Sequence, residues 1–243
     1  MSGHSKWSTI KHKKALADAK RASIFTKLAK NIAIAAGNGG NPDMNLKLRI
    51  AIDKARNENM PKDNIEKAIK RGTRELRDGT QIEEAIYEAY GPGNIAMLIK
   101  IATDNKNRTL AEVKNIISKN GGKMAEEGSV SWQFEQIGKL EVKKNGIDEE
   151  KIEMQIIESG ARDYYSKNNH FVVLLDSNKL QTAREFLEDQ DLAVKNPLLA
   201  YSAKNTTKLN AKDQKQFNSL MEALDENSDV VEIYDNISQI RNV

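Results

Sequence analysis

Residues 139–203 alternate between strand-like and helix-like patterns, and the order of these patterns is the feature that most constrains the fold. Short apolar runs mark strands, and longer runs with apolar residues three and four apart mark helices. The order is strand 139–143, helix 148–159, strands around Tyr164 and at 171–175, helix 179–189 and strand 192–203. Because β-α-β-β-α-β is the order of ferredoxin-like units, we expect one such unit here.

A second α/β pattern occupies residues 78–135. It predicts two strands, a helix and a third strand at 86–90, 95–102, 109–122 and 129–134. Gly91-Pro-Gly-Asn94 is a strong turn sequence, so the first two strands are expected to form a hairpin. Thr109-Leu-Ala-Glu112 has the form of a capping box that opens the helix, and Gly121-Gly122 is expected to end it.

The C-terminal residues predict one more helix and one more strand. The helix has apolar residues at helical spacing, namely Phe217, Leu220, Met221 and Leu224, and the strand covers 230–234. This α-β unit is too small to stand alone. We therefore expect it to complete the middle domain, so that residues 136–205 are an insertion into that domain.

The first 77 residues predict helices only. From Arg21 to Ala36 apolar residues fall on one helical side and lysines on the opposite side. Gly37 to Pro42 interrupts this pattern. A second helix is expected to point inward with Met44, Leu48, Ala51, Ile52 and Ala55. A third helix is expected to start near Pro61 and to be capped by Gly72.

The predicted fold class is therefore α+β and multidomain: an N-terminal all-helical domain is followed by two α/β domains, of which the last is ferredoxin-like and inserted into the middle one. The predicted boundaries are 1–77, 78–135 plus 206–243, and 136–205.

Charge is distributed unevenly along the chain. Residues 1–77 contain 12 Lys and 6 Arg against 7 acids, a net charge of +11, so the overall +3 leaves −8 for residues 78–243. The first 30 residues alone hold eight basic residues and one acid, Asp18. Such an asymmetry indicates a polyanionic partner at the basic end, with nucleic acid favoured over an anionic membrane.

The segment before Lys20 has few large apolar residues, so we expect a mobile basic tail. Its cations suit phosphates, and Trp7, His4 and His12 have flat faces that can stack on bases. The alternative is a solvated charged tail without a partner. Arg108 precedes a helix at a point where a cation gains nothing from the helix dipole, so it is expected to serve an anion or an acidic neighbour.

The residues expected to contact nucleic acid lie in this tail, on the basic faces of the helical domain and in the loop before the middle helix. They are His4, Lys6, Trp7, Lys11, His12, Lys13, Lys14, Lys20, Arg21, Lys27, Lys30, Lys47, Arg49 and Arg108.

Other functional classes find little support in the sequence. Without cysteine there are no disulfides or thiolate sites, and the three histidines suggest neither a metal site nor a catalyst. The glycine clusters at 37–40 and 121–122 lack the spacing of phosphate-binding loops. An RNA-recognition motif is rejected for 139–203, because Phe171 is the one aromatic residue of "KNNHFVVLLD" and its surroundings are acidic.

Four stretches resemble the YebC family: "GHSKWSTIKHKKALADAKRASIFTKLAK", "LRIAIDKARNENMPKDNIEKAIKRG", "YEAYGPGNIAMLIKIATDNKNRTLAEVK" and "GSVSWQF". This family comprises bacterial proteins described as probable transcriptional regulators, together with mitochondrial translational activators of cytochrome oxidase subunit one. The matching residues are His4, Ser5, Lys6, Trp7, Ile10, Lys11 and His12 in the tail, and Asn105, Arg108 and Thr109 in the loop. The chain departs from the family at Gly37, where relatives often carry Arg, and at "DYYSKNNHF", which replaces a more acidic turn.

The resemblance implies three domains, a cytoplasmic location and no enzymatic activity. It also implies two competing roles: a DNA-binding regulator of transcription, and a ribosome-associated factor that relieves stalling at proline runs. We expect a monomeric, non-enzymatic nucleic-acid-binding protein without a cofactor, metal or membrane contact, whose partner is promoter DNA or ribosomal RNA. The alternative is a protein-interaction adaptor whose basic end steers it to acidic partners.

Overall fold

Three helices form the N-terminal region: α1 (Gly3–Ala36), α2 (Leu46–Asn57) and α3 (Lys62–Gly72). The computed structural model of the protein describes residues 3–75, 81–146 and 148–237, with the backbone alone for 3–17. One apolar cluster joins the three helices and includes Leu28, Ile32, Leu48, Ile52, Ala55, Ile65 and Ala68. The prediction of a helical N-terminal region is confirmed.

Helix α1 is longer than predicted. It begins at Gly3, so the prediction that this helix starts near Arg21 is wrong, and the backbone of the basic segment is helical. The physical reason lies in composition: the segment is rich in Ala and Lys, which favour helix, and no Gly or Pro interrupts it before Gly37. The mobility of that segment stays a prediction. Met44 is also misplaced by the sequence pattern, because it precedes α2 and its side chain is 88% exposed.

Gly72 has a different role from the predicted cap. It is the last residue of α3, and a Cβ atom added there would lie 2.1 Å from the carbonyl oxygen of Ala33 and 2.7 Å from the Cβ atom of Ala36. Only glycine lets the backbones of α1 and α3 approach this closely. The absence of a side chain at this position therefore fixes how the two helices pack.

The middle part of the chain forms an antiparallel sheet, called sheet A here, with the strand order β3-β1-β2-β8. Its strands are β1 (Glu83–Tyr90), β2 (Ala96–Thr103), β3 (Lys123–Met124) and β8 (Val230–Asp235). Helices α4 (Lys106–Lys119) and α7 (Ala211–Glu226) pack their apolar residues against this sheet in one core. The predicted hairpin and the predicted C-terminal helix and strand are confirmed.

The predicted strand at 129–134 is wrong. β3 lies earlier in the chain, and Ser131–Gln133 forms a short 3₁₀ turn. The buried carboxylate of Glu88 accepts the backbone N–H groups of Gly128 (2.8 Å), Val130 (2.5 Å) and Ser131 (3.0 Å). Because a side chain takes the donors that a strand would pair, this segment curls around Glu88 instead.

The predicted start of α4 is also wrong. The cap is Asn105, whose side-chain oxygen accepts the backbone N–H of Arg108 at 3.1 Å. Thr109 lies inside the first turns of α4 and is fully buried. The predicted end of the helix is confirmed, since Asn120 caps it and Gly121 follows with φ of 78°.

The predicted ferredoxin-like order is confirmed in a second antiparallel sheet, called sheet B here, with the strand order β5-β6-β4-β7. Its strands are β4 (Phe134–Lys143), β5 (Asp163–Lys167), β6 (His170–Asp176) and β7 (Val194–Ala203). Helices α5 (Glu149–Glu158) and α6 (Leu180–Asp189) pack on one face of it. Short 3₁₀ turns lie at Pro92–Asn94 and Ser177–Lys179.

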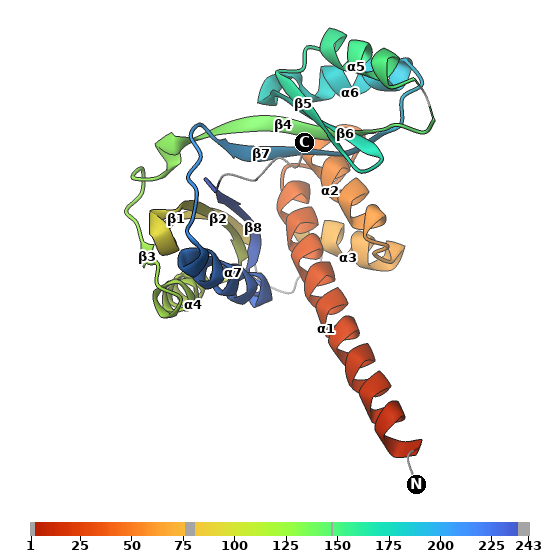
Figure 1. Ribbon diagram of the computed structural model, residues 1–243. Helices are drawn as coiled ribbons and strands as arrows, with labels where there is room; N and C mark the ends of the chain where they lie inside the picture. Colours follow the sequence, from red (N-terminus) through yellow and green to blue (C-terminus); the bar gives the residue numbers. More distant parts are fainter. Residues whose placement is uncertain (1–2, 76–80, 147, 238–243) are drawn as a thin grey trace.

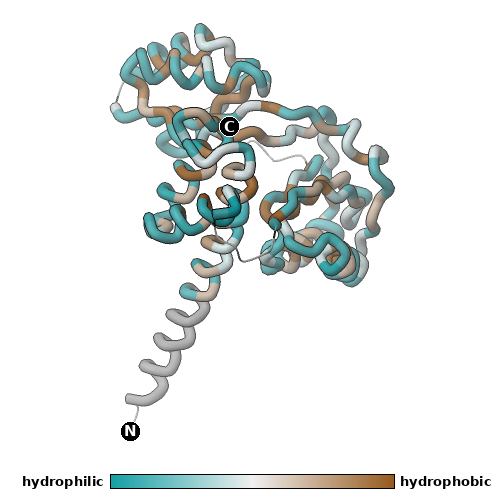
Figure 2. Tube along the Cα trace, turned by 180° about the vertical axis from the view of Figure 1, so that it is seen from behind, coloured by the Kyte–Doolittle hydropathy of each residue, from teal (hydrophilic) through white to brown (hydrophobic). Residues whose placement is uncertain are grey.

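Figure 1 shows the two sheets and the helical region arranged around one another, with α1 projecting from the group. Strand β8 pairs with β2, so sheet A is completed by residues that follow all of sheet B in the chain. In Figure 2 hydrophobic segments, in brown, alternate with hydrophilic segments, in teal, along the trace. The exact domain boundaries stay a prediction.

Replacing Gly72 by Ala is expected to destabilise the protein by about 1–3 kcal/mol, because the added methyl group collides with the backbone of α1. Urea unfolding measures the change. Gly37→Ala is the matched control, since its nearest contact is 3.2 Å away and the residue is exposed. Equal stability of the two variants would contradict the close packing of α1 and α3.

Candidate nucleic-acid interface

The first half of α1 carries most of the residues expected to contact nucleic acid. Lys20 and Arg21 are exposed on it. Lys6, Lys13, Lys20 and Lys27 follow one another at intervals of seven residues. Such residues lie only about 20° apart around a helix, so their backbone positions form a stripe along one side of α1.

The tail residues themselves are placed only by their backbone. Their positions are on α1, and their side chains lie outside the described part of the structure; they are His4, Lys6, Trp7, Lys11, His12, Lys13 and Lys14. Their contacts with nucleic acid stay a prediction.

Lys27 and Lys30, in the second half of α1, are occupied by acids of the C-terminal region. The Nζ atom of Lys27 donates to the carboxylate of Asp225 at 2.8 Å and to its carbonyl oxygen at 2.5 Å. Lys30 donates to the carboxylate of Asp229 and, at 2.8 Å, to the carbonyl oxygen of Ser228. These contacts hold α1 against the connection between α7 and β8.

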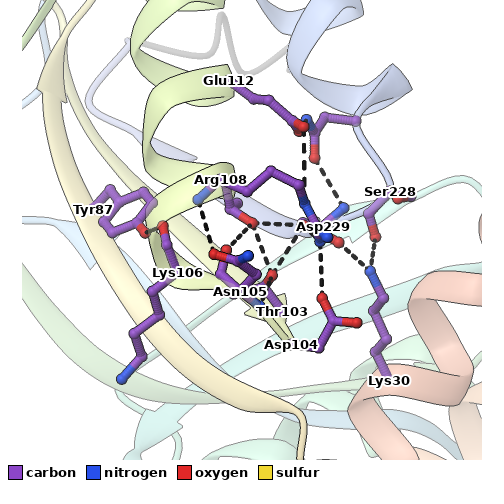
Figure 3. Close-up of polar contacts among 12 residues, drawn as sticks. Lys30, Tyr87, Thr103, Asp104, Asn105, Lys106, Arg108, Glu112, Ser228 and Asp229 are labelled. Atoms are coloured by element: carbon purple, nitrogen blue, oxygen red, sulfur yellow. Dashed lines mark hydrogen bonds and ion pairs between the residues drawn. The ribbon is translucent and has the colours of Figure 1, made fainter. Parts of the chain in front are cut away.

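The carboxylate of Asp229 is the centre of a polar cluster (Figure 3). Its side chain is only 6% exposed, yet it accepts hydrogen bonds from the hydroxyl groups of Thr109 (2.6 Å) and Thr103 (3.0 Å) and from Arg108 (3.0 Å), as well as from Lys30. Burial opposes ionisation, but the donors of Lys30, Thr109 and Arg108 outweigh it and hold the pKa of the Asp229 carboxyl well below its usual range. Asp229 is therefore a buried, ionised carboxylate that four side chains share as their acceptor.

Arg108 serves acidic neighbours, one of the two roles expected for it. Its guanidinium lies 2.9 Å from Asp104, 3.0 Å from Asp229 and 3.9 Å from Glu112 (Figure 3). Hydrogen bonds with Asp229 and Asp104 raise the pKa of Arg108 above its usual value. The side chain of Arg108 is 48% exposed. A contact with nucleic acid would have to use this exposed part.

Two predicted contact residues belong to α2. Arg49 donates to the carbonyl oxygens of Pro42 (3.0 Å) and Asp43 (2.7 Å), so it clamps the loop before α2. Lys47 is exposed. It lines a cleft of about 370 Å³ between the helical region and both sheets.

The structure thus sorts the predicted residues by what their side chains do. Lys20, Arg21 and Lys47 are exposed. Lys27, Lys30, Arg49 and Arg108 have partners within the protein. The sequence did not predict the role of Asp229. An acidic residue before an apolar strand does not indicate that Lys30 of α1 and Arg108 of α4 will bind its carboxylate.

Within 3–75, 81–146 and 148–237 no helix combines the length and the apolar character needed to cross a membrane. The same part of the chain holds no group of three His, Asp or Glu residues able to bind a metal ion.

Comparison with known proteins decides the family. The model described as the TACO1/YebC protein N-terminal domain matches residues 5–75, and that of the TACO1/YebC second and third domain matches residues 82–237. The chain belongs to the TACO1/YebC family. The second match begins at the start of sheet A and ends just after β8, which agrees with the completion of that sheet by the C-terminal strand.

Relatives match the chain over nearly its whole length. A protein of Solibacter usitatus is 46% identical and covers 97% of this chain and 95% of its own, and one of Chlorobium luteolum is 45% identical with 98% and 95% covered. Both are called probable transcriptional regulatory proteins. The crystal structure of a conserved hypothetical protein from Aquifex aeolicus has a TM-score of 0.83 and 34% identity, and covers 93% of this chain and 95% of its own.

Replacing Asp229 by Asn is expected to cost about 2–4 kcal/mol of stability at neutral pH, since Lys30 and Arg108 lose their shared anion. A carboxylate whose pKa is lowered by folding stabilises the protein above its ordinary pKa of about 4, and this contribution fades as the pH falls below that value. The difference between wild type and Asp229→Asn should therefore shrink in acid, as urea unfolding across pH would measure.

Asp225→Asn is the control for this experiment. The side chain of Asp225 is 74% exposed and pairs with Lys27, so its loss should cost less than about 1 kcal/mol at any pH. If both variants lose the same free energy of unfolding, the buried Asp229 cluster stabilises the protein no more than an exposed ion pair does.

Proposed function

We propose that the protein is a non-enzymatic regulator of gene expression that binds nucleic acid through the first half of α1. The observation that carries the proposal is the net charge of +11 on residues 1–77, combined with the projection of α1 away from the rest of the chain (Figure 1). The names of the relatives, probable transcriptional regulatory proteins, support a role in regulation.

The geometry of α1 suits this role. A helix of 18 residues, from Gly3 to Lys20, is about 27 Å long and about 10–12 Å wide with its side chains. A rod of that width fits the major groove of B-DNA, which is about 12 Å wide, and can equally lie along ribosomal RNA. Its base is held by Lys27 and Lys30, so bound phosphates would be positioned relative to the two sheets.

Changing Lys11, Lys13 and Lys14 to Glu should weaken binding to every nucleic-acid sequence alike, because phosphate contacts carry no base information. If four to eight phosphates are neutralised, log K of the wild type should fall with log salt at a slope of roughly −3 to −7, and the variant should show a flatter slope. Fluorescence anisotropy with duplex DNA and single-stranded RNA measures both.

The control changes Lys212 and Lys215, two exposed lysines of α7, to Glu. It lowers the net charge without touching α1 and should bind nearly as well as the wild type. If the affinity of the wild type for nucleic acid did not change with salt, the electrostatic interface would be refuted. If the α1 variant lost affinity for one DNA sequence alone, a sequence-specific regulator would be favoured instead.

A second candidate function is relief of ribosome stalling at proline runs, which the family resemblance implies and which the thin, basic, projecting α1 favours. A purified translation system stalled on a proline-rich message should recover with the intact protein but not with a chain that starts at Lys20. The shortened chain keeps the apolar cluster of α1 to α3, so its melting temperature should be nearly unchanged. Recovery with both chains, or with neither, would leave promoter binding as the better account of α1.

A further inference from the structure

Sheet B has a second face, opposite α5 and α6, whose composition is unexpectedly basic. On the helix-covered face Leu140, Val142, Phe171, Val173 and Leu175 pack with α5 and α6. Successive residues of a strand point to opposite faces. The residues between these positions therefore face the other way.

The strand register collects lysines on this second face. Lys143 of β4 pairs with His170 of β6, and His170 pairs with Lys167 of β5, so these three residues form one cross-strand row. In the next row Lys195 of β7 pairs with Glu141 of β4. Lys139 follows two residues away from Glu141 on the same face. We call Lys139, Lys143, Lys167 and Lys195 the lysine quartet.

The members of the lysine quartet crowd one another. The neighbouring Lys195 lowers the pKa of Lys143. Burial lowers the pKa of Lys139, and the charge of Lys167 adds to this while Glu141 opposes it. Like charges on neighbouring strands destabilise a sheet unless something compensates them.

Few acids compensate the quartet. Glu141 is the one acid within these rows, and it also accepts a hydrogen bond from Asn196 at 2.8 Å. Asp163 lies at the edge of the face, paired with Leu174. Among the described residues none of the four lysines forms an ion pair within 4.0 Å, whereas Lys27, Lys30, Lys54 and Lys100 do.

We propose that this face of sheet B is a second nucleic-acid contact surface, where the lysine quartet binds the phosphates of a single strand. Adjacent strands lie about 4.8 Å apart, so the quartet, on β5, β4 and β7, extends across the whole width of the sheet. Lys167 is exposed and the other three lysines are half-buried. A flat sheet cannot enter the groove of a duplex, but it can hold an unpaired strand against its surface. The proposal goes beyond the function proposed above, since it does not involve α1.

The test compares Lys143→Gln/Lys195→Gln with Lys151→Gln/Lys212→Gln, a control that removes the same charge from exposed lysines of α5 and α7. The probe is an unstructured RNA of about 20 nucleotides, longer than a typical single-strand site. If two phosphate contacts are lost, the sheet variant should bind about tenfold more weakly at 0.1 M salt, with a slope flatter by about 1.4, while the control binds like the wild type.

Protection from acetylation tests the wild-type protein directly and does not depend on the folding of a variant. RNA should slow the acetylation of Lys143 and Lys195 and leave Lys151 unchanged. Equal reactivity with and without RNA, or equal affinity of the sheet variant and the control, would overturn the proposal.

The outcomes separate this surface from α1. Loss of binding in the α1 variant alone would overturn the sheet surface and leave the proposed function standing, and loss in the sheet variant alone would do the reverse. Vesicles of phosphatidylcholine with phosphatidylglycerol serve as a second polyanion. Binding of vesicles through the quartet, without binding of RNA, would overturn the assignment to nucleic acid in favour of a membrane surface.

Discussion

The carboxylate of Asp229 joins the helical region to sheet A and its helix α4. It joins Lys30 of α1, Thr103 of β2 and both Arg108 and Thr109 of α4, and it stands immediately before β8. A buried anion is tolerated only when donors replace its water, and here four side chains do so. The same bonds fix the base of α1 relative to sheet A. Removing the anion would leave two cations facing one another across that joint.

The uneven charge of the chain has two uses in the structure. Part of it holds the regions together, since Lys27, Lys30 and Lys54 of the helical region pair with Asp225, Asp229 and Glu232 of the C-terminal region. Lys20 and Arg21 are exposed and form no ion pair within the described part of the chain, so they are available to an external polyanion. The sequence asymmetry alone could not separate these uses, because pairing across about 200 positions is set by the fold.

Elements with a strong apolar pattern were predictable, and those governed by a single side chain were not. The ferredoxin-like order and the three N-terminal helices follow from the spacing of apolar residues, and these residues form the buried clusters of the structure. The strand expected at 129–134 fails because Glu88 binds its backbone, and the role of Gly72 as a contact with Ala33 depends on a neighbour from another helix. For the site, sequence identified the basic helix and Arg108, but Asp229 and the lysine quartet come from strands distant in the chain and have no local signal.

The loop before α4, whose Asn105, Arg108 and Thr109 match the family, positions other parts of the protein. Asn105 caps α4, Thr109 is buried against Asp229, and Arg108 meets Lys30 at the same carboxylate. The contacts at the packed end of a projecting helix are the ones that can hold its direction. The direction of α1 relative to sheet A is consequently set at its base by Asp229 and by the residues of β2 and α4 that surround it.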